Sequence, residues 1–146
     1  MDLSKLKSSG HIREIPIDKK QIDDLIKLAK RDLKVAEKLI SDNLDWSFIV
    51  SYNSMLQISR AFMYSYGYTT SEEEHHKTVI EFLRAIIGEK EKDLTNTLDR
   101  MRRKRHEVTY DESDIVSDFE AKVALEMAKK CMEILEKRIK EKLSKL

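Results

Sequence analysis

The sequence predicts an all-α fold, an up-and-down bundle of about five helices with a long C-terminal helix. Helix breakers are rare, because the 146 residues include only three glycines and one proline. Apolar residues recur at intervals of three and four along most of the chain, which is the period of an amphipathic helix. A chain of this length most simply forms one domain with a substantial hydrophobic core.

Charge and cysteine content exclude several classes of protein. The formal net charge is +1, so any attraction to nucleic acid or to a membrane surface must come from a local patch. Cys131 is the only cysteine, which excludes a disulfide framework within one chain, and its place in an apolar stripe indicates packing. No stretch approaches the roughly 20 apolar residues of a membrane span, and no signal-peptide pattern opens the chain. We expect a cytoplasmic protein with no membrane association and no cofactor.

The chain divides into a short arm and a helical domain. Residues 1–18 include Gly10 and the only proline, Pro16, and they show no clear period, so we expect an extended or partly ordered N-terminal arm. Residues 19–146 form the predicted helical domain. Its first helix begins at Asp18 and ends near residues 41–43. The apolar face of this helix comprises Ile22, Leu25, Ile26, Ala29, Leu33, Ala36 and Ile40.

The second predicted helix, roughly Asp45 to Tyr66, carries two apolar stripes, so we expect it to be the central element. Gly67 should end it in a left-handed conformation. The aromatic residues at helical spacing indicate core packing rather than a base-stacking platform, and the polar Asn53 and Arg60 indicate satisfied groups beside the core. A chain this short would not cover such a helix alone, so we expect a two-fold homodimer. The aromatic residues are Trp46, Tyr52 and Phe62.

Three further helices follow. Ser71 and Glu74 have the spacing of a capping box, and Gly88 is a plausible end for the helix that they open. The next helix runs from about Lys90 into a basic segment. The last runs from about Ser113 to the C-terminus, and its tail from Lys137 is expected to extend beyond a compact bundle. Its apolar stripe comprises Ala124, Ala128, Cys131, Leu135, Ile139 and Leu143.

The basic segment is the main candidate for a functional site. Six of the seven residues 100–106 are Arg, Lys or His, and like charges on a helix repel one another. Arg105 lies on the apolar stripe of its helix, where an unpaired charge costs several kcal/mol. We therefore expect it to have a carboxylate partner, a polar cleft or an anionic ligand. The expected nucleic-acid-binding residues are Arg100, Arg102, Arg103 and Lys104.

Other interpretations of the charged and histidine residues remain open. The basic segment could be a solvated face whose arginines pair with acids of the last helix, because such surface pairs are common and nearly neutral in energy. His75 and His76 are adjacent and diverge by about 100° on a helix, so they do not indicate a metal site. His106 and Tyr110 are four residues apart, on a polar stripe beside Arg105.

Four stretches, AKRDLKVAEKLI, YNSMLQISRAFMYSYGY, HHKTVIEFL and LDRMRRKRHEVTYD, occur in an order that resembles the HEPN (higher eukaryotes and prokaryotes nucleotide-binding) domain family. The resemblance covers nearly the whole chain, which is most similar in pattern to the small prokaryotic and archaeal members of the family. It implies a helical bundle that often dimerises and a nucleotidyltransferase partner in a toxin–antitoxin-like pair. Members with an intact Arg-x4-His motif cut RNA without metal.

Transfer of that motif gives Arg105, then His106 at the polar second position, and Tyr110 where the family has histidine. A looser spacing runs from Arg100 to His106. Tyrosine, with an unperturbed pKa near 10, is mainly a hydrogen-bond donor at neutral pH, so activity as a metal-independent endoribonuclease stays undecided. The alternatives are a non-catalytic module that binds a nucleotide, RNA or a partner, and a purely structural bundle. In the family, the nucleotidyltransferase partner can attach nucleotides to a tyrosine beside the motif. That tyrosine usually lies two residues beyond the histidine position, where this chain has Glu112.

Overall fold

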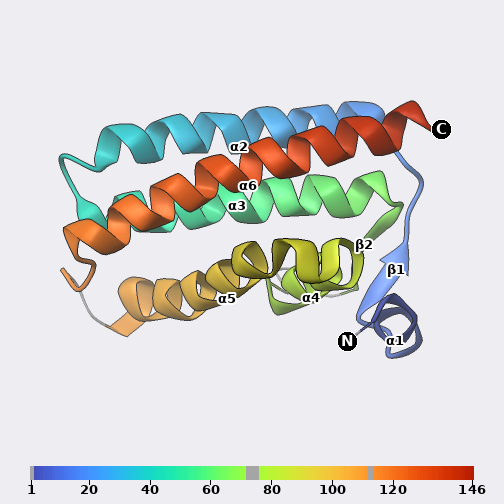
Figure 1. The fold of residues 1–146 in the computed structure, drawn as a ribbon, viewed down its shortest axis with the longest axis horizontal. Helices are drawn as coiled ribbons and strands as arrows, with labels where there is room; N and C mark the ends of the chain where they lie inside the picture. Colours follow the sequence, from blue (N-terminus) through green and yellow to red (C-terminus); the bar gives the residue numbers. More distant parts are fainter. Residues whose placement is uncertain (1, 72–75, 112–113) are drawn as a thin grey trace.

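The computed structural model describes residues 2–71, 76–111 and 114–146, with the side chains of Tyr110 and Asp111 left undescribed. The predicted all-α bundle and its long C-terminal helix are confirmed (Figure 1). The helices α2, α3 and α6 run side by side along the molecule, and α4 and α5 pack beside them on α3. The bundle helices are α2 Lys19–Leu39, α3 Leu44–Ser65, α4 His76–Ile87, α5 Lys92–His106 and α6 Asp118–Ser144.

The N-terminal segment is more ordered than the sequence predicted. It forms the short helix α1 Leu3–Ser8 and the strand β1 Ile12–Glu14, which pairs antiparallel with β2 Tyr68–Thr70. Leu6 and Ile12 are buried in the main core, so this segment packs on the bundle rather than lying free. Gly67 precedes β2 with φ +80, the predicted left-handed end of α3.

The central helix α3 is covered within one chain. Tyr52, Met55 and Phe62 are fully buried, because α2 and α6 cover one side of α3 while α4 and α5 pack on the other. The premise from which we expected a homodimer is therefore wrong, although the dimer itself is not tested by this finding. Trp46 is also not in the core. It lies in the first turn of α3, at the end of the bundle, and is 57% exposed.

The C-terminal helix begins later and ends more compactly than predicted. A capping box starts it, with the Ser117 Oγ accepting from the Glu120 amide at 3.0 Å and the Glu120 carboxylate accepting from the Ser117 amide at 3.0 Å. The tail does not extend beyond the bundle, because Ile139 is fully buried and the Lys142 ammonium lies 5.1 Å from the Tyr66 ring centroid. The capping box predicted at Ser71 involves Glu74, which lies outside the described residues.

The replacement Ser117→Ala should lower the free energy of unfolding by about 1 kcal/mol, the usual cost of losing an N-cap hydroxyl. Urea denaturation followed by circular dichroism measures this change. Ser144→Ala is the matched control, because Ser144 lies in the last turn of the same helix and its hydroxyl bonds only to the Glu141 carbonyl. Equal stability of the two variants would show that the capping box does not stabilise α6.

Three further expectations concerned membrane spans, metal ligands and the single cysteine. None of the helices within the described ranges is long and apolar enough to cross a membrane. In the same part of the chain, no three His, Cys, Asp or Glu side chains gather as metal ligands would. Cys131 is fully buried, and burial raises the pKa of its thiol to about 12, so the thiol stays protonated and acts as a packing group.

Candidate functional site around Arg105

The predicted apolar face of α5 is confirmed, with Arg105 placed on it. Leu94, Leu98, Met101 and Val108 are buried, whereas Arg105 is half-buried. After His106 the backbone continues as a π-helix, Glu107–Asp111. Such wide turns are uncommon and often occur at functional sites. The motif residues therefore lie where the regular α-helix gives way to a different backbone geometry.

Arg105 packs on an aromatic ring and keeps an unused hydrogen-bond donor. Its guanidinium carbon lies 6.0 Å from the centroid of the Tyr52 ring, within the range of a cation–π contact. Its Nε is buried, and no described residue accepts a hydrogen bond from it. We expected Arg105 to have a carboxylate partner, a polar cleft or an anionic ligand. No carboxylate among the described residues pairs with it. A buried donor without an acceptor costs about 1–3 kcal/mol unless another molecule supplies the acceptor.

Tyr52 connects Arg105 to α4. Its Oη lies 3.0 Å from the Nδ1 of His76, the first residue of α4. Burial raises the pKa of Tyr52 above its ordinary value, and the positive charges of Arg105, Arg102 and Arg60 only partly oppose this shift. The phenol is therefore neutral at physiological pH, and the three arginines are close enough to act on it. Arg60, which we expected as a polar group beside the core, is one of these three.

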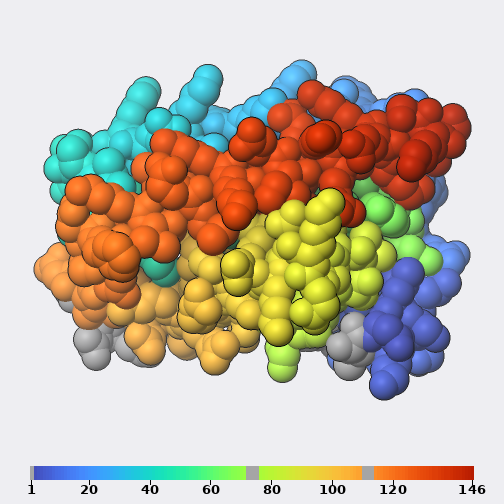
Figure 2. All heavy atoms as spheres, viewed as in Figure 1, coloured from blue at the N-terminus to red at the C-terminus, as the bar shows by residue number. Residues whose placement is uncertain are grey.

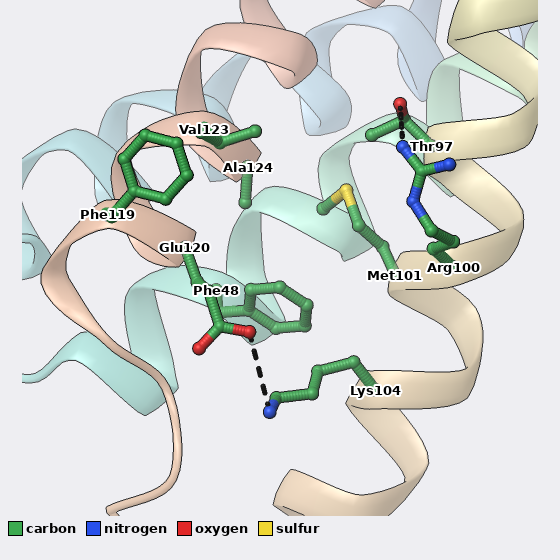
Figure 3. Close-up of a pocket in the computed structure, with 9 residues that line it drawn as sticks. All are labelled: Phe48, Thr97, Arg100, Met101, Lys104, Phe119, Glu120, Val123 and Ala124. Atoms are coloured by element: carbon green, nitrogen blue, oxygen red, sulfur yellow. Dashed lines mark hydrogen bonds and ion pairs between the residues drawn. The ribbon is translucent and has the colours of Figure 1, made fainter.

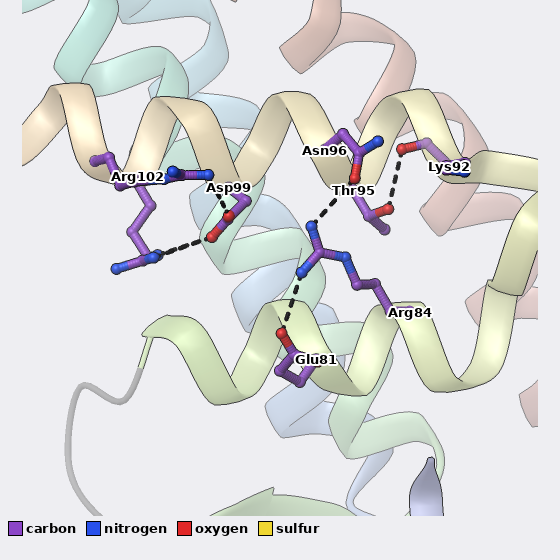
Figure 4. Close-up of polar contacts among 8 residues, drawn as sticks. Glu81, Arg84, Lys92, Thr95, Asn96, Asp99 and Arg102 are labelled. Atoms are coloured by element: carbon purple, nitrogen blue, oxygen red, sulfur yellow. Dashed lines mark hydrogen bonds and ion pairs between the residues drawn. The ribbon is translucent and has the colours of Figure 1, made fainter. Parts of the chain in front are cut away.

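Asp99 neutralises two cations of the basic segment (Figure 4). It accepts a hydrogen bond from Arg102 Nε at 3.1 Å and another from Arg103 Nη2 at 2.8 Å. Burial of Asp99 would raise the pKa of its carboxyl, but the hydrogen bonds and charges of both arginines outweigh this effect and hold the pKa below its usual range. These two expected phosphate contacts therefore already have a carboxylate partner within α5.

A polar bridge fixes α4 against α5 beside this site. Arg84 of α4 donates to the Asn96 side chain of α5 at 3.2 Å and to Glu81 of its own helix at 3.1 Å (Figure 4). This bridge is a polar contact that joins α4 to α5.

The other two cations of the segment border a groove between α5 and α6 (Figure 3). Lys104 pairs with Glu120 of α6 at 3.5 Å, and Arg100 donates to the Thr97 hydroxyl at 3.0 Å. Among the described ion pairs, Lys104 alone of the basic segment bonds to an acid of the last helix. The alternative that the arginines pair with acids of the last helix is therefore wrong for Arg102 and Arg103, because both pair with Asp99 of their own helix.

The structure describes the side chains of two of the three predicted catalytic residues, Arg105 and His106. Arg105 lies against Tyr52, whereas His106 is exposed and, as the next residue, points about 100° away around α5. The backbone of Tyr110 lies in the π-helix, but its side chain is outside what the structure describes, as is Glu112. Sequence reasoning missed Asp99 and the contact between Tyr52 and His76. The spacing of Asp99 from Arg102 and Arg103, three and four residues, was a usable signal.

Comparison with known proteins agrees with the resemblance in the motifs. The family model described as HEPN domain matches residues 22–139, which include all five bundle helices in the described structure except the first residues of α2 and the last of α6. No curated protein and no solved structure matches the chain. Because the matched segment covers most of the sequence, the chain belongs to the HEPN domain family.

Proposed function

We propose that this HEPN protein binds RNA, with Arg105 donating to a phosphate oxygen. One observation carries the proposal: Arg105 Nε is buried with no acceptor among the described residues, in a site where Arg60 and Arg102 add positive charge around Tyr52. A phosphate oxygen is an acceptor of the right charge, and charge-assisted hydrogen bonds of this kind are the strong ones. Family membership is consistent with a role in nucleotide or RNA binding.

The same site has one part of a ribonuclease active site, the cation, but lacks the histidine that would carry a proton. RNA cleavage without metal requires a base for the 2′-hydroxyl proton, an acid for the leaving oxygen and cations for the phosphorane charge. Arg105 supplies the cation. Tyr52 is fully buried and its hydroxyl lies against His76, so it positions Arg105 and is not a proton carrier. Histidine is absent at position 110, where the family motif has it. We therefore propose RNA binding as the main function, with cleavage slow or absent.

The proposed cellular setting is a two-component, toxin–antitoxin-like pair with a small nucleotidyltransferase. The pairing is what the resemblance to small prokaryotic members implies, and family membership is consistent with it. The gene next to this one should encode that protein, and the two products should co-purify when expressed together. A neighbouring gene of another class, with no complex formed, would contradict the pairing while leaving RNA binding intact.

Salt dependence of RNA binding tests the proposed function. Fluorescence anisotropy with a single-stranded RNA of about 12 nucleotides should give log K falling linearly with log salt concentration. Two or three phosphate contacts correspond to a slope of about −1.4 to −2.1. Absence of binding at about 50 mM salt would contradict the proposal.

The variant Asp99→Asn should bind the same RNA more tightly and with a steeper slope, because it releases Arg102 and Arg103 for phosphates. It should also be less stable at neutral pH by about 1–2 kcal/mol. The depressed pKa of Asp99 means that this stabilisation exists above the ordinary carboxyl pKa of about 4 and is lost as pH falls through the folded-state value. The stability difference should therefore shrink in acid. Asp93→Asn, an exposed change of equal charge in the first turn of α5, is the control.

A further inference from the structure

The neighbouring helices bury α3 except along one narrow stripe. On the face drawn in Figure 2, the side chains of α5 and α6 lie over most of α3. In α3, which is described throughout, every residue beyond the first two that is not buried falls on one line, at steps of three and four residues. We call this line the α3 stripe, and it comprises Trp46, Val50, Asn53, Gln57, Arg60 and Tyr64.

Trp46 stands at one end of the α3 stripe with its indole ring largely uncovered. It is 57% exposed, whereas tryptophan side chains are on average highly buried. The backbone at this position is fixed, because the Trp46 amide donates to the side chain of the N-cap residue Asn43 at 2.9 Å. An exposed aromatic ring on a rigid helix is what a base-stacking residue needs, because every base has a flat π-face to place on it.

The middle of the α3 stripe is polar and carries a positive charge. Asn53 and Arg60 lie seven residues apart on the same face, and both are half-buried. Gln57 lies between them and donates to Asp32 of α2 at 3.0 Å. Asp32 already pairs with Arg31 at 3.0 Å, so its charge is compensated within α2. The stripe therefore presents an aromatic ring, amides and a guanidinium, which suit the bases and phosphates of a nucleic-acid strand.

The α3 stripe adjoins the proposed phosphate site. Arg60 on the stripe and Arg105 on α5 both act on the buried phenol of Tyr52. Trp46 is six residues from Tyr52 along α3, a rise of about 9 Å. Successive phosphates of one stacked strand rise by about 3.4 Å, so two or three nucleotides cover this distance. One short strand therefore reaches from the phosphate site to the indole ring.

We propose that single-stranded RNA lies along the α3 stripe, with one base stacked on Trp46 and a phosphate beside Arg60. This inference rests on the proposed function, because it extends the strand bound at Arg105. It also names the form of RNA that the protein selects. A base inside a duplex has no free face for the indole ring, so unpaired RNA should bind more tightly than duplex RNA.

Tryptophan fluorescence tests the stacking directly, because Trp46 is the only tryptophan of the sequence. A single-stranded RNA of about 12 nucleotides should quench this fluorescence saturably, with the affinity that anisotropy gives. Inorganic polyphosphate is the control, because it carries charge without bases and should compete with RNA without quenching. RNA that binds without quenching, or polyphosphate that quenches equally, would overturn this inference alone. Absence of RNA binding would overturn both the inference and the proposed function.

The salt dependence of RNA binding separates stacking from charge. Trp46→Ala should weaken binding about 5- to 100-fold and leave the slope of log K against log salt concentration unchanged, because a stacked base releases no counterion. Arg60→Met should instead make the slope shallower by about 0.7, the contribution of one phosphate contact in a single strand. Trp46→Phe keeps an aromatic ring and should retain most of the affinity.

Phe119→Ala is the matched control, because Phe119 is an exposed aromatic residue on α6, outside the α3 stripe. It should leave RNA affinity unchanged, and circular dichroism should show all four variants folded. A Trp46→Ala protein that binds RNA as tightly as the wild type would overturn the inference. So would an equal loss of affinity in Trp46→Ala and Phe119→Ala.

Discussion

Replacing Arg105 with methionine is expected to weaken RNA binding by about 10- to 100-fold, while the protein becomes no less stable. The lost affinity corresponds to the charge-assisted hydrogen bonds of one guanidinium, about 1.5–3 kcal/mol. Stability should rise by about 1 kcal/mol, because the substitution removes a buried donor that has no acceptor among the described residues. The methionine side chain still fills the space over Tyr52. Fluorescence anisotropy and urea denaturation measure the two quantities.

Arg103→Met is the matched control, because it removes the same charge from an exposed residue that Asp99 already neutralises. Its effect on RNA affinity should be less than about threefold, in keeping with the small worth of an exposed ion pair. An equal loss of affinity in both variants would mean that only total charge matters. A loss of stability in Arg105→Met would mean that this guanidinium serves the fold rather than a ligand.

The substitution Tyr110→His should create or raise ribonuclease activity by about two to four orders of magnitude, the usual worth of general acid–base catalysis. It restores the histidine of the family motif while leaving every cation of the basic segment in place. Histidine suits this role because its unperturbed pKa of about 6.5 allows it to carry a proton near neutral pH. Cleavage of a fluorescently quenched RNA, measured in the presence of a metal chelator, gives the rate.

Three companion variants make this result specific. Tyr110→Phe removes the hydroxyl without adding a proton carrier, so it should not raise the rate. His106→Ala in the Tyr110→His background should change the rate little if His106 is not the proton carrier, and should abolish the gain if it is. Arg105→Met in that background should remove the gain, because Arg105 supplies the cation at the proposed phosphate site. A Tyr110→His protein as inactive as the wild type would contradict the ribonuclease-like arrangement.

Helix content and helix order could be predicted because they depend on local patterns. The start of the first helix at Asp18 and the left-handed Gly67 were predicted from the sequence, and both are confirmed. The start of α6 was placed too early, at about Ser113, although Ser117 and Glu120 have the spacing of a capping box. The strand Ile12–Glu14 was missed because its partner lies more than fifty residues away and leaves no local signal.

Only part of the candidate site could be predicted, because contacts between distant parts of the chain leave no local pattern in the sequence. Arg105 could be singled out because a charge on an apolar stripe conflicts with the pattern around it, and that conflict marks a functional residue. The contact of Tyr52 with His76 could not be predicted, since it joins two helices 24 residues apart in sequence. The expected dimer rested on the apolar character of α3, but periodicity alone does not show how many neighbouring helices will cover a helix. In the structure α3 is covered from both sides.

The most direct test of RNA binding at Arg105 is an NMR titration that resolves arginine Nε–H groups, with the Arg105 signal assigned by comparison with Arg105→Lys. The account predicts that this signal shifts saturably when single-stranded RNA is added, because a phosphate oxygen becomes the acceptor that the described protein lacks. The affinity from this shift should match that from anisotropy. An Arg105 Nε–H signal that stays in place while RNA binds would contradict the account.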